Sequence, residues 1–118
     1  MEINNILNHS KKVLINNQKR DGHWVYELEA DTTIPSEYIL MNHFLGIKEK
    51  NFEKKIAVYL KMEQNSDGGW PLFRKGKSNI STSVKAYYAL KLIGEKQNAP
   101  HMVKAKKKIL DLGGADNC

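Results

Sequence analysis

A seven-residue motif occurs twice in this chain and constrains the fold more than any other feature. Residues 64–70 read Gln-Asn-Ser-Asp-Gly-Gly-Trp, and residues 18–24 read Gln-Lys-Arg-Asp-Gly-His-Trp. Gln, Asp, Gly and Trp recur at one offset, since 64 − 18, 67 − 21, 68 − 22 and 70 − 24 all equal 46. Both tryptophans of the chain lie in these two copies. Such a period is typical of helix–turn–helix repeats, so we interpret the chain as a repeat protein.

Five segments with helical or continuous apolar patterning flank the two motifs, and we expect each to form a helix. They cover residues 3–17, 35–45, 51–63, 84–93 and 101–112. Residues 35–45 and 84–93 are apolar nearly all round, which predicts inward, well-buried helices. Residues 24–28 are expected to be an extended connection and 71–78 a loop, while 31–33 and 81–83 supply N-cap side chains.

These elements predict an all-α chain with the order outer helix, turn, inner helix, twice over, followed by one more outer helix. The repeat units would cover about 1–46, 47–94 and 95–118. Two and a half hairpins bury little apolar surface, because each hairpin needs neighbours to cover its apolar face. We therefore expect an incomplete segment of a longer repeat structure.

The motif residues themselves are expected to be structural. They are Gln18, Gly22, Trp24, Gln64, Gly68, Gly69 and Trp70. Trp offers a large apolar surface and one N–H, and Gln can bond backbone groups at the start of a neighbouring helix. The functional alternative is an aromatic pair that lines a site for a cationic or apolar ligand.

Composition and charge narrow the classes of partner. Nineteen Lys and Arg against thirteen Asp and Glu give a net charge of +6, with the densest basic run at 104–108. Solvated helix faces explain this run best, an anionic membrane surface next, and nucleic acid least, since no aromatic residues are interleaved. Cys118 is the single cysteine, so an internal disulfide is excluded, and no Cys or His spacing suggests a metal site. The sequence shows no signal peptide and no apolar run long enough to span a bilayer.

Several stretches resemble one family. Residues 64–73 resemble the Gln–Trp repeat motif of squalene and oxidosqualene cyclases. Residues 22–31, 36–40, 84–91 and 99–115 resemble the start of bacterial squalene–hopene cyclases, so the similarity covers nearly the whole chain.

The resemblance implies that the chain is the N-terminal part of an α/α-barrel (toroid) domain. The parent would be a triterpene cyclase of the intramolecular isomerase or hydro-lyase type. It would fold squalene in a cavity, protonate a terminal alkene and close rings to hopene or hopanol in hopanoid biosynthesis, with no cofactor and no metal. It would sit as a monotopic protein on the cytoplasmic side of the cell membrane, through parts mostly outside this chain, and a homodimer of the full-length enzyme is a further expectation.

The acid that this chemistry needs is missing from the sequence. The family uses an Asp-x-Asp-Asp motif, in which clustered carboxylates keep one aspartic acid protonated as a general acid. The aspartates here are isolated: Asp21, Asp31, Asp67, Asp111 and Asp116. We therefore expect this chain alone to be inactive.

One residue of the chain is a candidate for supporting that acid. The resemblance places Glu37 in a hydrogen-bond network around the acid, and the alternative is a glutamate favoured by the dipole at its helix N-terminus. Lys85 stands at the matching place of the next unit, where the family pattern has Glu, so no role is carried over to it.

Two alternatives remain, a module of another class and a different α/α-barrel enzyme, and the sequence argues against the second. The chain could be a non-catalytic helical-repeat module that docks on a partner or a membrane. A protein prenyltransferase β-subunit has a similar architecture but needs a zinc site built from Asp, Cys and His, for which Cys118 is the only thiol.

Overall fold

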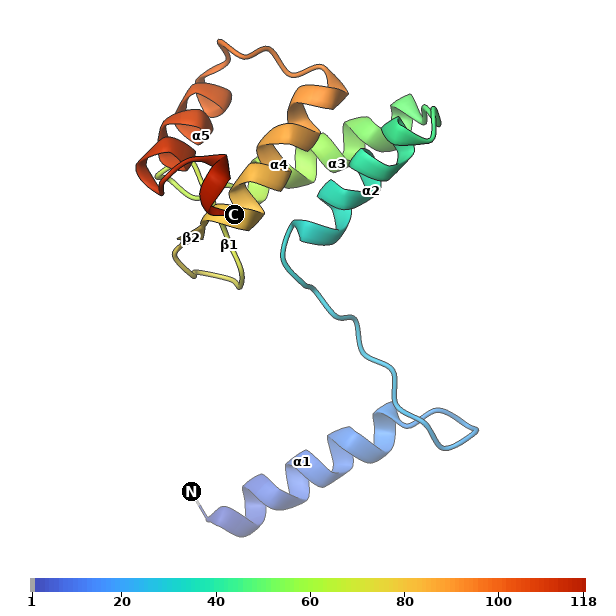
Figure 1. The fold of residues 1–118 in the computed structure, drawn as a ribbon. Coiled ribbons are helices and arrows are strands. Elements are labelled where there is room, and N and C mark those ends of the chain that lie inside the picture. Colours follow the sequence, from blue (N-terminus) through green and yellow to red (C-terminus); the bar gives the residue numbers. More distant parts are fainter. Residues whose placement is uncertain (1) are drawn as a thin grey trace.

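The computed structural model describes residues 2–118 as a compact helical body with one helix standing apart from it (Figure 1). Within this range the elements are five α-helices, two short strands and one 3-10 turn. They are α1 (Ile3–Asn17), α2 (Thr33–Phe44), α3 (Lys50–Glu63), β1 (Trp70–Pro71), β2 (Ser78–Asn79), α4 (Ile80–Ile93), α5 (Pro100–Asp111) and η1 (Ala115–Asn117). The prediction of an all-α chain is confirmed, and the helix limits differ from the predicted ones by at most four residues.

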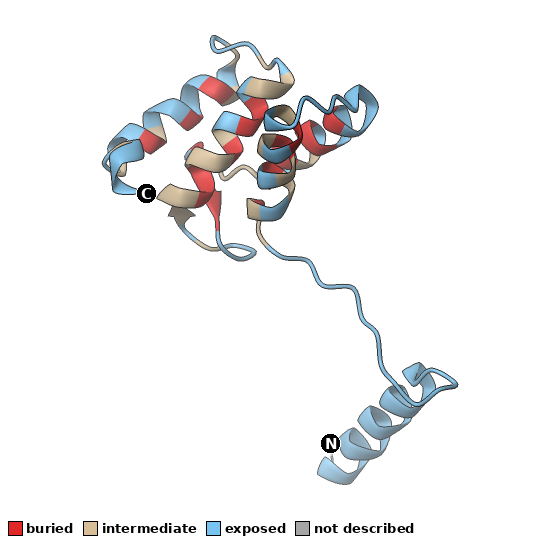
Figure 2. Ribbon diagram, turned by 45° about the vertical axis from the view of Figure 1, so that its right-hand side comes forward, coloured by how far each residue is buried: buried red, intermediate tan, exposed pale blue. Residues whose placement is uncertain are grey.

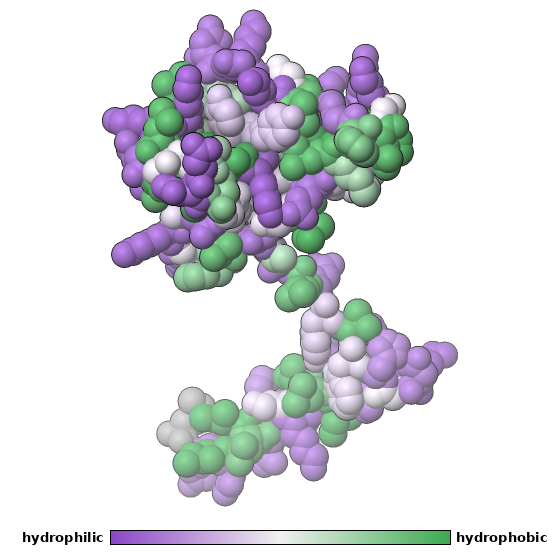
Figure 3. Space-filling view, in the orientation of Figure 1, coloured by the Kyte–Doolittle hydropathy of each residue, from purple (hydrophilic) through white to green (hydrophobic). Residues whose placement is uncertain are grey.

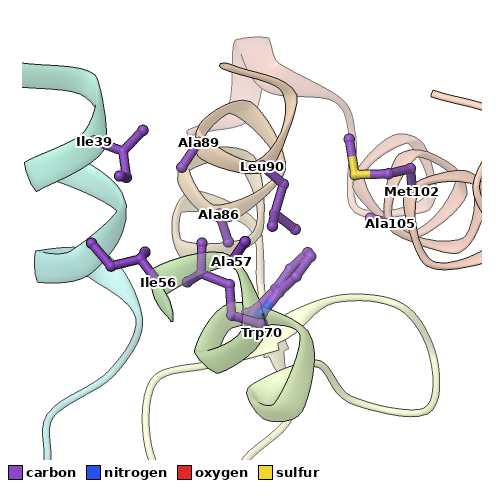
Figure 4. Close-up of a cluster of buried hydrophobic side chains, with 10 residues drawn as sticks. Ile39, Ile56, Ala57, Trp70, Ala86, Ala89, Leu90, Met102 and Ala105 are labelled. Atoms are coloured by element: carbon purple, nitrogen blue, oxygen red, sulfur yellow. Dashed lines mark hydrogen bonds between the residues drawn. The ribbon is translucent and has the colours of Figure 1, made fainter. Parts of the chain in front are cut away.

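Helix α4 is the centre of the body and contacts α2, α3 and α5. Its buried face carries Ala86, Ala89 and Leu90, and the two alanines let neighbouring helices approach closely. The core gathers apolar side chains from all four helices and from β1 (Figure 4): Ile39, Ile56, Ala57, Leu60, Trp70, Ala86, Ala89, Leu90, Met102 and Ala105. Burying each of the larger side chains contributes about 1.5–3 kcal/mol, so this cluster is the main source of stability.

Helix α1 lies outside this body. All its residues are exposed, and so are residues 18–30 (Figure 2). Residues 18–24 form a turn, and the residues after it run as an extended connection toward α2. An isolated helix of this length is only marginally stable in water, because helix formation has a costly nucleus. Its stability therefore depends on packing that residues 25–118 do not supply here.

The inner helices are buried on one face only. In α2 the buried residues are Ser36, Ile39 and Asn42, while Met41 and Phe44 are 52% and 90% exposed. The prediction of a well-buried helix is therefore wrong for α2 in this structure. The pattern is apolar all round, but the described residues cover only the side that faces α3 and α4.

The connection between the second motif and α4 is more ordered than predicted. Residues 71–78 were expected to be a loop, but β1 and β2 pair antiparallel, with Trp70 opposite Asn79 and Pro71 opposite Ser78. Helix α4 starts at Ile80, and its N-cap is Asn79, whose side chain accepts a bond from the Thr82 N–H at 3.2 Å. The predicted caps at 81–83 are therefore wrong, because the helix begins directly after the hairpin, about one turn earlier than predicted.

Candidate functional site

The two Gln–Trp turns have the same internal geometry. Each glutamine ends its outer helix and donates from Nε2 to the carbonyl of the glycine four residues later, at 2.7 Å for Gln18 and 2.8 Å for Gln64. Each tryptophan Nε1 donates at 2.7 Å to a carbonyl ten residues earlier, on Leu14 or Leu60.

The backbones of the two turns also match. Gly22 and Gly68 both have φ near +95°, the left-handed region that side chains disfavour. The Lys19 N–H donates to the His23 carbonyl at 2.8 Å, and the equivalent bond from Asn65 to Gly69 has the same length. The turn is therefore specified by residues within itself and the preceding helix.

The second turn is packed against the start of α5. Beyond its internal bond, Gln64 Nε2 donates to the His101 carbonyl at 3.0 Å. A Cβ on Gly68 would lie 2.5 Å from the backbone carbon of Lys104, so only glycine allows this approach. Trp70 is fully buried, and its backbone N–H donates to Ser83 Oγ at 2.9 Å. Gln64, Gly68 and Trp70 thus join α3, α4 and α5.

Charged groups hold the same junction from outside. Asp67 accepts from Ser78 Oγ at 2.6 Å and lies 3.1 Å from Lys108 Nζ on α5. Burial raises the pKa of the Asp67 carboxyl, but the bonds from Ser78 and from the Gly69 N–H, together with Lys108, outweigh it and lower the pKa overall.

A second ionic group lies at the opposite end of α5. Glu95 accepts from Lys61 Nζ at 2.7 Å, and this bond lowers the pKa of the Glu95 carboxyl against the opposing effect of burial. His101 Nε2 lies 2.9 Å from the other Glu95 oxygen, within ion-pair distance but without hydrogen-bond alignment. These contacts are structural, because they fix α5 against α3.

The first turn lacks this packing. Trp24 is 46% exposed, and the nearest atom to a Cβ on Gly22 would be its own Gln18 Nε2, at 4.0 Å. Within the described residues Gln18 makes the internal bond to Gly22 but has no counterpart of the bond from Gln64 to His101. The sequence motif therefore predicts the turn but not its surroundings.

Glu37 lies on the open face of α2 and has a partner. Its Oε1 accepts from Lys85 Nζ on α4 at 2.7 Å, and the two side chains are 48% and 38% exposed. The two residues occupy matching positions of successive inner helices, since 85 − 37 is 48. Beyond the pair, Met41, Phe44 and Tyr88 continue the same face as an apolar surface. This face, with one ion pair and a row of large apolar side chains, is the candidate functional surface of the body.

A partly buried pair links α2 to α3. His43 Nε2 lies 3.0 Å from Glu53 Oε1, and the Glu53 residue is 7% exposed. The ring of Tyr38 meets that of Phe52 edge-on, with centroids 5.4 Å apart. Sequence reasoning singled out neither contact, because neither residue pair belongs to the repeated motif.

Metal and membrane-spanning features are absent from the part of the chain that the structure describes. Residues 2–118 contain no group of three or more His, Cys, Asp or Glu side chains placed to hold a metal ion. In the same range, each helix is either too short or too polar to pass through a bilayer.

Comparison with known proteins identifies the family. The model of the squalene–hopene cyclase N-terminal domain matches residues 7–118. A squalene–hopene cyclase of Zymomonas mobilis is 48% identical over 97% of this chain and 18% of its own length. One of Bradyrhizobium diazoefficiens is 52% identical over 83% of this chain and 15% of its own length.

More distant relatives carry other names. A dammaradiene synthase of Dryopteris crassirhizoma is 34% identical over 89% of this chain and 15% of its own length. The chain thus spans less than a fifth of the length of these relatives. On the match of the N-terminal domain model over residues 7–118 and on these identities, the chain belongs to the squalene–hopene cyclase family.

Proposed function

We propose that this chain is the N-terminal part of an enzyme that cyclises squalene to hopene or hopanol, and that it is inactive without the rest of that enzyme. The family match over residues 7–118 carries the proposal. The relatives named squalene–hopene cyclase share 48% and 52% identity with it. The length of the chain supports the proposal that it is only part of the enzyme, because it spans 18% of the length of the first of these relatives.

The chemistry explains why the chain alone would be inactive. Protonating an alkene needs a strong, positioned acid, which the resemblance assigns to an Asp-x-Asp-Asp motif that this sequence does not contain. Two carboxylates of the body, Glu95 in the connection between α4 and α5 and Asp67 in the second turn, are held in ion pairs with Lys61 and Lys108. Such pairs favour the ionised carboxylate, which has no proton to donate to an alkene.

The chain would supply a wall of the substrate cavity. The open faces of α2 and α4 present Met41, Phe44 and Tyr88, which suit an apolar polyene. Glu37 would support the acid from this wall through hydrogen bonds, as the family resemblance implies. The ion pair with Lys85 supports the proposal by fixing the Glu37 carboxylate in one orientation. Peripheral contact with the cytoplasmic face of the membrane would come mostly from other parts of the enzyme.

A chimera tests the proposal. This chain is joined, after its matched region, to the remainder of the Zymomonas mobilis relative, and squalene products are measured by gas chromatography. We expect hopene or hopanol from the chimera, and none from this chain or from the remainder expressed alone. Product from the 118 residues alone would contradict the predicted inactivity, and an inactive chimera would contradict the proposed function.

Two variants of the chimera test the candidate residue. Glu37→Gln should lower turnover about tenfold or more, since it removes a charged acceptor from the network that supports the acid. Glu27→Gln, on the exposed connection, is the matched control and should leave turnover unchanged. Equal rates for the two variants would remove Glu37 from the proposal.

A further inference from the structure

The ion pair between Glu37 and Lys85 bridges the two inner helices of the body. Glu37 lies in the first half of α2 and Lys85 in the first half of α4. Lys85 Nζ donates to Glu37 Oε1 at 2.7 Å, and within residues 2–118 neither side chain has another ion-pair partner. Each of the two side chains therefore depends on the other for its orientation.

The backbone on both sides of the pair is held firmly. Ser36, Ile39 and Ala86 are fully buried, and they lie within two residues of one member of the pair. Ser36 Oγ also donates to the Thr32 carbonyl at 2.6 Å. The side chains of the pair are themselves partly exposed. The helices thus fix where Glu37 begins, and the bond from α4 decides where its carboxylate ends.

The pair borders an apolar surface. The exposed side chains of Met41, Phe44 and Tyr88 continue the same face, and the end of α2 is green in the space-filling view (Figure 3). If an apolar substrate covers this face, the Glu37 carboxylate loses water, and burying an unpaired charge is costly. Lys85 supplies the opposite charge that offsets this cost.

Lys85 engages only one of the two carboxylate oxygens. Within residues 2–118 the bond to Lys85 is the only hydrogen bond that the Glu37 carboxylate makes, so Oε2 is open to a donor from the rest of the enzyme. An unrestrained glutamate samples many rotamers and loses that freedom when it is ordered. Holding Oε1 at Lys85 therefore presents Oε2 in a narrower range of directions.

We propose that Lys85 is a positioning residue of the cyclisation reaction, which offsets the charge of Glu37 and aims its second oxygen at the polar network that supports the acid. The inference rests on the proposed function, because that network would lie in the part of the enzyme beyond this chain. Lys85 itself would touch neither the substrate nor the acid. The whole effect of replacing it should therefore pass through Glu37.

Kinetics with squalene in the chimera described above test the inference. Lys85→Met keeps an unbranched apolar side chain but removes the charge, and it should lower kcat about tenfold, the effect of losing a charged hydrogen bond. The KM should change less than about twofold, because the apolar wall is intact. Lys85→Arg keeps a charged donor and should bring kcat to within about threefold of the parent chimera.

Lys91→Met is the matched control. Lys91 is exposed on the same helix and has no ion-pair partner within the described residues 2–118. The same change of residue type should therefore leave kcat and KM at the values of the parent chimera.

Combined variants separate positioning from a direct or a purely structural role. In the Glu37→Gln background, Lys85→Met should lower kcat less than about twofold, because the carboxylate that it orients is gone. Exchanging the charges, with Glu37→Lys and Lys85→Glu together, retains an ion pair but moves the carboxylate to α4, so it should not restore turnover. Melting temperatures of all these chimeras should stay within about 4 °C of the parent, since a half-exposed ion pair adds little stability.

The outcomes separate this inference from the proposed function. Three results would overturn the inference while the parent chimera still forms hopene or hopanol: an unchanged kcat in Lys85→Met, a loss of kcat that persists in the Glu37→Gln background, and recovery of turnover on charge exchange. A parent chimera without product would overturn the proposed function and this inference together. A loss in Lys85→Met that Lys85→Arg relieves and Glu37→Gln abolishes would establish the positioning role.

Discussion

The two Gln–Trp turns share the bonds of their glutamine and tryptophan and differ in their surroundings. Both have glycine at φ near +95° and a tryptophan bonded to a carbonyl ten residues earlier. Yet Trp70 is fully buried and Trp24 is 46% exposed. The comparison teaches that the motif encodes the turn locally, whereas residues outside the repeated positions decide what packs on it. Ser78, Ser83 and Lys108 serve the second turn in this way.

The tryptophans should give the largest contrast. Trp70→Ala should cost about 3–5 kcal/mol of unfolding free energy, because it opens a cavity in the core and strands the Leu60 carbonyl. Trp24→Ala should cost the body less than about 1 kcal/mol, since it touches only α1. Urea denaturation followed by circular dichroism measures both. Because Trp70→Ala could prevent folding, Trp70→Phe is the milder companion, with an expected loss of about 1–2 kcal/mol from the missing N–H. Similar losses at residues 24 and 70 would show that the first turn is packed in solution.

The glycines should give the next contrast. Gly68→Ala combines positive φ with a clash against the Lys104 backbone, so its cost should exceed about 3 kcal/mol. Gly22→Ala should cost about 1–2 kcal/mol, because only the strain of positive φ applies there. This cost destabilises the turn after α1. The melting temperatures of the two variants, measured in the same buffer, test this contrast. If Gly22→Ala lowers the melting temperature of the body as much as Gly68→Ala, the two turns are not packed differently.

The glutamines should differ by about one hydrogen bond. Gln64→Ala removes bonds to Gly68 and His101 and should cost about 1–2 kcal/mol. Gln18→Ala removes the internal bond alone, and in an exposed turn its cost should stay below about 1 kcal/mol. Amide exchange at the start of α5 gives a local readout, which should quicken only for Gln64→Ala. Unchanged exchange in both variants would contradict the bond to His101.

The smallest effect concerns pH. The pKa of Asp67 is lowered below its ordinary value of 3.8, so the folded state favours the carboxylate. Its contribution to stability is present above that value and is lost as pH falls from 3.8 through the lower folded pKa. Asp67→Asn should therefore reduce stability at pH 7 and flatten its fall in acid. Asp21→Asn, at the matching exposed position, should leave the profile of the body unchanged. If Asp67→Asn keeps the wild-type dependence of stability on pH, the bonds to Ser78 and Lys108 make no net contribution to stability.

Sequence reasoning predicted the elements well and their placement poorly. The 3.6-residue pattern and the glycine stops located all five helices, because those signals are local. Helix α2 was predicted to be well buried, but burial depends on neighbours, and Phe44 faces solvent. The hairpin after Trp70 was missed because two-residue strands carry no alternation to detect.

The candidate surface was predicted only in part. Glu37 was identified by resemblance, but its partner Lys85 received no role, because the family pattern has Glu at that place. Nothing in the sequence shows that positions 48 apart on successive helices face each other. One signal was available and unused. The replacement of Gly69 by His23 within an otherwise matching motif indicates that the two turns connect onward by different routes.

The extended connection between α1 and α2 has a consequence for biosynthesis. During translation α1 leaves the ribosome before α2 to α5, whose contacts form among residues that follow it in sequence. At about 5–20 residues per second, the body can assemble within seconds of its last helix emerging. Helix α1 finds no partner in that body, so its apolar stripe stays accessible to chaperones after the body has folded. Of the five helices, α1 is thus made earliest and is still unpacked when the other four have assembled.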